Sequence, residues 1–310
     1  MKVNNRVILA KIETVYGTDS VPTGAANAIW TRSISPTPHV LSTDDNTQIR
    51  PFFGQFEHAV GAVYATYEFE VPISLSAAAG TAPPWGPLLR ACAHSENIVA
   101  STSVTYHPIT TAEESATIYF HDDGNRFVMT GAKGTATFTF TEQKIPVIKF
   151  MMTGLVAAGG GITTVANPAS TFTPWTRAIM TNQVNTTFTV GGYAAPLQSL
   201  VLDVNNTTPY INRPNRQAVD FTDRKSKLTL NIEQPTLAQY DIWTAFRAGT
   251  QVAISFTNGT VAGNRFKLNS SGFQMEQPSS SDQDLVTMLS IPGKLIPTTA
   301  GGDEYTILLD

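Results

Sequence analysis

Charge is scarce in this sequence of 310 residues. Lys, Arg, Asp and Glu make up 14% of the chain, against roughly 25% in typical soluble domains. The net charge is -4, and no cluster of Lys and Arg marks a phosphate-binding face, which argues against tight DNA binding by one chain. So few charges are typical of secreted adhesins, β-sandwiches and subunits of large assemblies. Composition alone does not choose among these classes.

Cysteine and long apolar runs are also scarce. The single cysteine, Cys92, excludes a disulfide within the chain, and its apolar surroundings at 88–93 predict a small buried side chain. The N-terminus has no apolar run long enough for a signal peptide, and no later stretch is long enough to cross a membrane. We therefore expect a chain that is made and kept in the cytoplasm, with no membrane partner.

Catalytic and cofactor motifs are missing as well. The sequence has no Gly-x-Ser-x-Gly elbow, no phosphate-binding loop and no His-x-x-x-His pair. His121-Asp122-Asp123, with Glu113 and Glu114 nearby, contains the residue types of metal and acid-base sites. Asp122-Asp123-Gly124-Asn125 is also what a tight turn requires, because Gly and Asn tolerate positive φ, and we favour the turn. We predict no enzyme, no metal site and no cofactor.

One tetrapeptide occurs twice. Gly124-Asn125-Arg126-Phe127 recurs as Gly263-Asn264-Arg265-Phe266, so the offset in residue number is 263 − 124 = 139. The same offset aligns further residues without a gap: Val147 with Val286, Phe150 with Leu289, Met152 with Ile291 and Gly154 with Gly293. The match predicts a repeated structural unit.

Strand and helix signals follow the same order in both halves. The alternation at 67–75 predicts a strand with one apolar face, made of Tyr67, Phe69, Val71, Ile73 and Leu75. Pro83-Pro84-Trp85-Gly86-Pro87 then predicts the start of a short helix. In the second half, 228–232 alternates, Pro235-Thr236 is expected to cap the next element, and helical spacing runs to Gly249. We predict a mainly antiparallel β fold with one helix in each half.

The domain boundary is expected in a stretch rich in Gly and Ala. We divide the chain into a first domain with an N-terminal arm at 1–155, a linker at 156–170, a second domain at 171–297 and a C-terminal extension at 298–310. A turn-rich arm precedes the alternating strand of each half. The first arm contains Arg50 and Pro51, and the second contains Arg213 and Pro214.

The first arm is the strongest candidate for an interface. Phe52, Phe53 and Phe56 follow Arg50 and Pro51 in a loop bracketed by turn-forming residues. Burying three Phe side chains is worth more than roughly 4 kcal/mol, so their exposure would favour association. The alternative is that they fold back on the core of their own chain. We expect a contact between subunits, together with Arg213 and Pro214 of the second arm.

The opening segment resembles a known family. Residues 9–19, Leu-Ala-Lys-Ile-Glu-Thr-Val-Tyr-Gly-Thr-Asp, and the continuation at 22–29 are similar to the start of tail tube proteins of siphophages and their prophages. Length, repeat order and the Gly-rich link extend the similarity over nearly the whole chain as a pattern. The resemblance implies two tandem tail-tube-like β-sandwich or barrel domains, each with one flanking α-helix and a long hairpin arm.

The resemblance also implies an assembly. Single-domain members form hexameric rings, so a chain with two copies is expected to form the same ring as a homotrimer. Rings that stack head to tail give the tube of the virion tail, which is assembled in the bacterial cytoplasm. The long arms and the N- and C-terminal segments are expected to clamp successive rings. The implied partners are other copies of the chain, the tape-measure protein and DNA in the lumen, and the tail terminator and distal tail proteins at the ends.

Family lumens are mostly negative, which limits adhesion of DNA to the wall. The candidate lumen residues are Glu68 and Glu70, which alternate with the apolar face of their strand. The matching strand of the second half offers Lys227 and Glu233, which makes a set of mixed sign. An ordinary exposed strand face explains the same alternation without a lumen.

Two other functions stay open. A two-domain β-sandwich binding protein or adhesin would be favoured by a signal peptide or an aromatic sugar-binding platform, and the sequence contains neither. Another virion component, such as a capsid decoration protein or a tail terminator, would form discrete rings instead of filaments.

Overall fold

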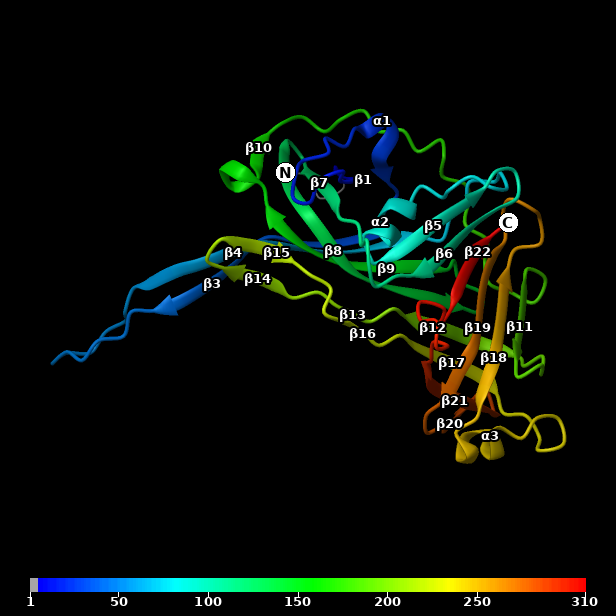
Figure 1. Ribbon diagram of the computed structural model, residues 1–310. Helices are drawn as coiled ribbons and strands as arrows, with labels where there is room; N and C mark the ends of the chain where they lie inside the picture. The colour runs from blue at the N-terminus through cyan, green and yellow to red at the C-terminus, as the bar shows by residue number, and fades with distance from the viewer. Residues whose placement is uncertain (1–4) are drawn as a thin grey trace.

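Alternating runs fold as antiparallel strands in the computed structural model, which describes residues 5–310 (Figure 1). Within that range, one 18-stranded sheet contains most of the strands, and two 2-stranded pairs stand apart from it. The α-helices are short. The prediction of a mainly β chain is confirmed.

The first half contributes a row of six neighbouring strands. Each pairs antiparallel with the next. The order is β3 (Ser33–Asp45), β4 (His58–Pro72), β9 (Val147–Val156), β8 (Asn125–Thr141), β7 (Ala116–Asp122) and β1 (Arg6–Ile12). On β4, Tyr67, Phe69 and Val71 are buried as predicted, so Glu68 and Glu70 point away from the core.

The second half has a row of strands paired in the same order. These are β12 (Leu197–Asp203), β17 (Lys227–Glu233), β21 (Val286–Leu295), β19 (Phe266–Met275), β18 (Gln251–Asn258) and β11 (Thr186–Val190). A further strand, β20 (Ser279–Gln283), pairs with β21 beyond the point where β19 leaves it. On β17, Leu228, Leu230 and Ile232 are buried, as their alternation predicts.

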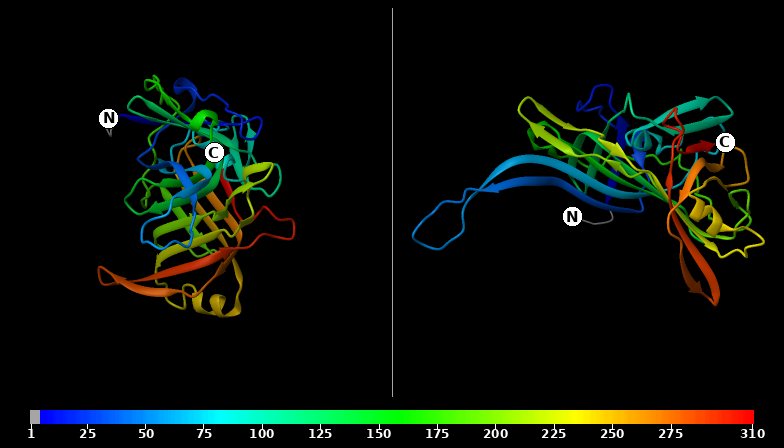
Figure 2. Two further views of the ribbon diagram at one scale, coloured as in Figure 1. Left: turned by 90° about the vertical axis from the view of Figure 1, so that its left-hand side faces the viewer. Right: turned by 60° about the horizontal axis from the view of Figure 1, so that its bottom comes forward.

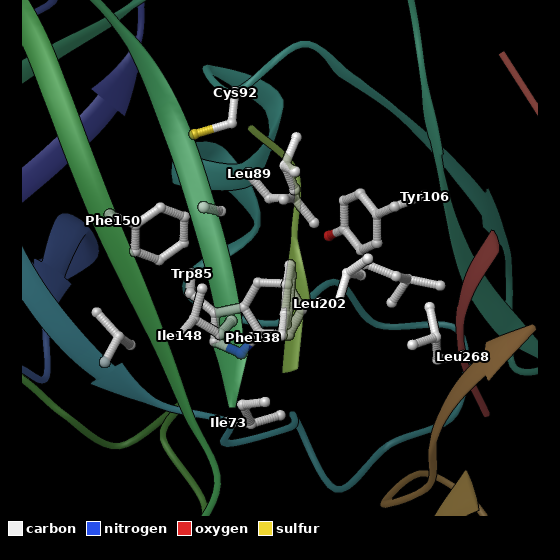
Figure 3. Close-up of a cluster of buried hydrophobic side chains, with 14 of the residues drawn as sticks. Ile73, Trp85, Leu89, Cys92, Tyr106, Phe138, Ile148, Phe150, Leu202 and Leu268 are labelled. Atoms are coloured by element: carbon white, nitrogen blue, oxygen red, sulfur yellow. The ribbon is translucent and has the colours of Figure 1, made fainter. Parts of the chain in front are cut away.

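The two rows lie side by side and share one hydrophobic core. The end of β8 pairs with β12, with Phe138 opposite Leu202. The ring centroid of Phe140, also on β8, lies 4.5 Å from the ring centroid of Phe256 on β18. Figure 3 shows part of this core, in which side chains from both halves meet. Cys92 lies at its edge and is buried, as predicted.

Short helices cap the sheet. Helix α1 (Gly24–Asn27) leads into β2 (Ala28–Ile29), and α2 (Gly86–Arg90) begins at the proline-rich segment, as predicted. Helix α3 (Ile242–Ala248) starts later than the sequence indicated. Asp241, and not Thr236, is its N-cap, because the Asp241 Oδ1 atom accepts a hydrogen bond of 2.9 Å from the Thr244 N–H. Gly249 ends the helix with φ of 62°, as predicted.

The tight turn predicted after Asp122 is present. Asp122 and Asn125 are paired across a two-residue turn that joins β7 to β8. The two turn residues have positive φ, 43° at Asp123 and 103° at Gly124. This geometry matches the twist of a hairpin, which explains why the sequence places Gly there.

The segments assigned to the linker and the C-terminal extension both contain strands. In the linker, the 3-10 helix Ala158–Gly160 is followed by β10 (Ile162–Thr164), which pairs with β8. Near the C-terminus, β22 (Thr306–Leu309) lies between β19 of the second half and β6 (Ser103–Pro108) of the first. Strand β5 (His94–Val99) continues this row beside β6.

Both halves carry a hairpin arm, but the arms lie differently. The outer parts of β3 and β4 form the first arm, which projects far from the body in Figure 1 and in the right-hand view of Figure 2. The second arm runs along the first half instead, beneath β8 and β9 in Figure 1. It consists of β13 (Asn206–Thr207), β14 (Tyr210–Arg213), β15 (Arg216–Val219) and β16 (Asp223–Arg224).

Candidate assembly surfaces

The tip of the first arm exposes its aromatic side chains. Phe53 is fully exposed and Phe52 is 64% exposed. The Arg50 guanidinium lies over the rings of Phe52 and Phe56, at 4.9 and 4.0 Å, and its Nη2 atom donates to the Gln55 carbonyl at 2.8 Å. These contacts shape the tip from within. The three Phe side chains do not fold back on the core of their own chain.

The second arm is docked on the first half. Its Tyr210 ring stacks on the ring of Tyr64, with centroids 4.7 Å apart. Across the hairpin from Tyr210, the Val219 N–H donates to the Tyr16 hydroxyl at 2.6 Å, and Val219 is fully buried. Arg213 lies at the outer end of β14, and Pro214 follows it in the turn.

The arms occupy matching positions in the two halves. Strand β9 carries Phe150 opposite Phe69, and β21 carries the matched Leu289 opposite Ile232. This register relates β4 to β17 by an offset in residue number of 232 − 69 = 163. Arg50-Pro51 and Arg213-Pro214 are related by the same offset (213 − 50 = 163), so arm and strand are matched without a gap.

Two of the edge strands are β3 and β20. Among the described residues, β3 pairs with β4 alone and β20 pairs with β21 alone. Every residue of β20 is exposed. Free N–H and C=O groups along such edges are ready to pair with another chain.

A comparison with protein family models identifies the family of the chain. The family model described as phage tail tube protein matches residues 3–295. The chain belongs to the phage tail tube protein family. A search of curated proteins gave no match. The protein is therefore a structural component of the phage tail, whose function is to assemble with further copies into a tube.

The candidate lumen residues of this tail tube protein lie on the side of the sheet away from the core. Glu68 is paired with Lys149 of β9, with Oε1 and Nζ 2.6 Å apart, and both side chains are about two-fifths exposed. Glu70 lies on the same face of β4. Lys227 and Glu233 are exposed at the two ends of β17. This face combines both signs of charge, as the sequence indicated.

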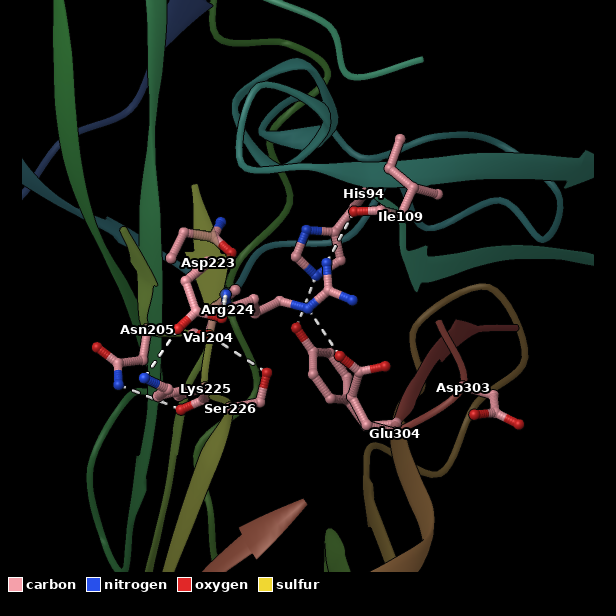
Figure 4. A network of polar contacts seen from close by, with 12 residues as sticks. His94, Ile109, Val204, Asn205, Asp223, Arg224, Lys225, Ser226, Asp303 and Glu304 are labelled. Carbon is pink, nitrogen blue, oxygen red and sulfur yellow. Dashed lines mark hydrogen bonds and ion pairs between the residues drawn. The ribbon is translucent and has the colours of Figure 1, made fainter. Parts of the chain in front are cut away.

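A buried polar network connects the C-terminal segment of the tail tube protein to both halves (Figure 4). Arg224 Nε lies 2.7 Å from Glu304 Oε1, and its Nη1 donates to the Ile109 carbonyl at 2.8 Å. His94 Nε2 lies 2.8 Å from the Tyr305 hydroxyl. Burial lowers the pKa of His94 to about 3, with a smaller contribution from the Arg224 charge. The network fixes the C-terminal segment to both halves and leaves His94 neutral at pH 7.

No group of three or more His, Cys, Asp and Glu side chains within residues 5–310 is arranged to hold a metal ion. His121, the histidine of the cluster weighed in the sequence, is buried between strands, and burial lowers its pKa. Over the same range, no helix has the length and hydrophobicity to span a bilayer.

Proposed function

We propose that three copies of the chain close into a pseudo-hexameric ring, and that rings stack into the tail tube of a siphophage. The observation that carries this proposal is the same strand order in both halves, combined with an edge strand at the matching end of each row, β3 in the first half and β20 beside β21 in the second. Two halves per chain supply six wall segments from three chains. In this interpretation residues 1–155 and 171–297 are the two copies of one tail-tube unit.

The internal junction provides a template for the junction between chains. Within the chain, β12 pairs antiparallel with the end of β8. Strand β20 corresponds to that end of β8. Ala136 of β8 lies opposite Phe150, and Ser280 of β20 lies opposite Leu289, which is the residue of the second half that matches Phe150. Strand β3 matches β12, since each lies beside the strand that follows its arm. The ring closes when β3 of one copy pairs with β20 of the next, which removes both open edges.

Stacking of the rings is assigned to the arm tips. Phe52 and Phe53 are exposed at the end of a hairpin that reaches beyond the body. Such apolar side chains gain free energy when a neighbour removes them from water. Phe56, Arg50 and Pro51 shape this tip, and Arg213 and Pro214 form the corresponding tip of the second arm.

The face that carries Glu68 and Glu70 is assigned to the lumen, through which DNA is delivered. Lys149, Lys227 and Glu233 share this face, so its net charge is small. Few unpaired cations remain to hold phosphate groups, and a weakly adhesive wall lets DNA pass. The tape-measure protein would occupy the lumen during assembly in the host cytoplasm, and terminator and distal tail proteins would close the two ends.

Negative-stain electron microscopy of the purified protein tests the proposal. We expect long hollow tubes above a threshold concentration, with three chains in each ring. Protein that stays monomeric at every concentration, or particles without a central hole, would reject it.

Phe52→Ser with Phe53→Ser should keep the circular dichroism spectrum and abolish tube growth, because the tips lose their apolar contact. Unchanged tubes from this variant would reject the role of the tips but not that of the protein.

A further inference from the structure

A large groove lies open on the second half. It has a volume of about 1340 Å³, and its lining includes Arg224 of β16, Lys225, Lys227 of β17 and Lys294 of β21, together with the carboxylates of Glu113, Asp223, Glu276 and Glu304. Lys227 and Lys294 are opposite one another in the strand pairing, and both are exposed. No ion pair in the described chain involves Lys227, while Lys294 lies 3.4 Å from Glu276.

The corresponding place on the first half is covered. The offset that relates β17 to β4 takes Arg224, Lys225 and Lys227 to Gly61, Ala62 and Tyr64. These three residues line the hollow in which the second arm lies. Tyr64 is the residue on which Tyr210 of that arm stacks. The first half therefore shows an occupied site, and the second half shows the same site empty of an arm.

We propose that this groove receives the two sides of the first arm, residues 44–48 and 57–58, of the next copy of the chain in the ring, while the tip at 50–56 extends past it. The proposal rests on the assembly described above and assigns its lateral contact. Within one chain, the second half packs beside the first half in a fixed arrangement. In the ring, the first half of the next copy packs beside the second half in the same arrangement. This arrangement places β3 of the next copy beside β20. It also places the first arm of that copy over Lys227, as the second arm lies over Tyr64 within the chain.

The charges of arm and groove fit this pairing. In the occupied site, an aromatic arm residue meets an aromatic platform, Tyr210 on Tyr64. In the open site, the platform residues are Lys227 and Lys294. The first arm carries Asp44, Asp45 and Glu57 along its strands, where the second arm has Thr207, Thr208 and Asp220. Arg224, Lys225 and Lys294 of the groove are already paired with Glu304, Asp223 and Glu276, whereas Lys227 has no ion pair within the described chain. Lys227 is therefore the cation of the groove that the carboxylates of the first arm can match.

Cross-linking of assembled tubes tests the contact. Tyr210 matches Thr47 and Tyr64 matches Lys227, so Thr47→Cys with Lys227→Cys places two thiols across the proposed interface. A short bifunctional maleimide should convert most chains into a covalent ladder that ends at the number of chains per ring. An equimolar mixture of the two single variants should stop at dimers. The native Cys92 is buried and should not react.

Two control pairs make the result specific. Tyr64→Cys with Tyr210→Cys should cross-link within one chain, because these rings are already stacked. Thr47→Cys with Glu233→Cys should give no ladder, since Glu233 lies at the opposite end of β17, on the same face and roughly 20 Å away. Tubes without a Thr47–Lys227 ladder would overturn the docking and leave the tube function standing. A ladder longer than one ring would also overturn it, because the arm would then reach another ring.

Charge reversal provides an independent readout if the cysteine pair prevents assembly. Lys227→Glu with Lys294→Glu should raise the protein concentration needed for tubes at least tenfold. Adding Asp45→Lys and Glu57→Lys to the same chain should restore most of that loss. Equal thresholds for the wild type and the first variant, or no restoration by the second, would reject the contact. Wild-type protein that never forms tubes would instead reject the function on which the proposal rests.

Discussion

His94 shows what a single buried group does in this chain. Its ring is fully buried, with Nδ1 2.9 Å from the Cys92 carbonyl and Nε2 2.8 Å from the Tyr305 hydroxyl. The nearby cation, Arg224, is paired with Glu304, and that ion pair is also buried. A proton added to His94 would create a charge with little access to water. The residue therefore makes the folded state sensitive to acid.

We expect a specific dependence of stability on pH. Burial holds the pKa of His94 near 3 in the folded chain, whereas an unfolded chain takes up the proton below about 6.5. The contribution of neutral His94 to the free energy of unfolding is complete above that ordinary pKa, and it is lost as the pH falls toward 3. Between pH 7 and pH 4 the wild type should lose about 3 kcal/mol more unfolding free energy than His94→Gln. Urea unfolding of unassembled protein at several pH values measures this, and parallel profiles would contradict it.

At the scale of elements, short-range patterns were readable and long-range pairings were not. The alternation of Tyr67, Phe69 and Val71 identified β4, and Asp123-Gly124 identified the turn between β7 and β8, because both signals lie within a few neighbouring residues. The offset of the repeated Gly-Asn-Arg-Phe also aligned β9 with β21. Asp241 was missed as a helix cap because the Pro235-Thr236 pair offered an earlier start.

The edge strand β20 was missed for a physical reason. Strand β20 is Ser279–Gln283, a polar run with no apolar face, and it gives no hydrophobic alternation to recognise. The insertion of β22 between the halves depends on contacts between distant parts of the sequence, such as Leu308 with Thr105. The exposed Phe tip was found because its composition is unusual for a loop. Which surface the second arm covers required the fold itself.

The open edge of β20 leads to a prediction about its backbone. Gln283 and Val286 are paired across a two-residue turn, so the N–H groups of 279, 281 and 283 point to β21, and those of 280 and 282 point outward. Ser280→Pro removes one outward donor and leaves the hairpin bonds intact. We expect an unchanged circular dichroism spectrum and at least a tenfold higher protein concentration for tube formation.

The matched controls for that edge are Ser280→Thr and Ser281→Pro. Threonine keeps the outward N–H and should assemble as the wild type does. Proline at 281 removes a bond to β21 and should lower the melting temperature of the unassembled chain. Sedimentation and electron microscopy across concentrations give the assembly threshold. Normal tubes from Ser280→Pro would mean that β20 is not a joint between copies.

At the scale of the whole molecule, the two matching rows of strands are built around a common interior. Phe138 and Phe140 of the first half have their rings 5.9 and 5.1 Å from the ring of Phe266 in the second. Ile307 of β22 is fully buried between β6 and β19. In the proposed ring, joining two units into one chain would replace every second interface with a covalently fixed one. Only the remaining interfaces would depend on concentration.

Dividing the chain should show this dependence. A fragment of residues 1–165 would expose Phe138 and Phe140 to water and lose the strand contributed by β22, which costs several kcal/mol of apolar burial. We expect this fragment alone to be insoluble or to lack a cooperative melting transition. Co-expression with residues 166–310 should recover a soluble complex with a spectrum like that of the whole chain, because the shared core can form again. Calorimetry and size-exclusion chromatography measure both outcomes, and a fragment that melts cooperatively by itself would show that the first half has a core of its own.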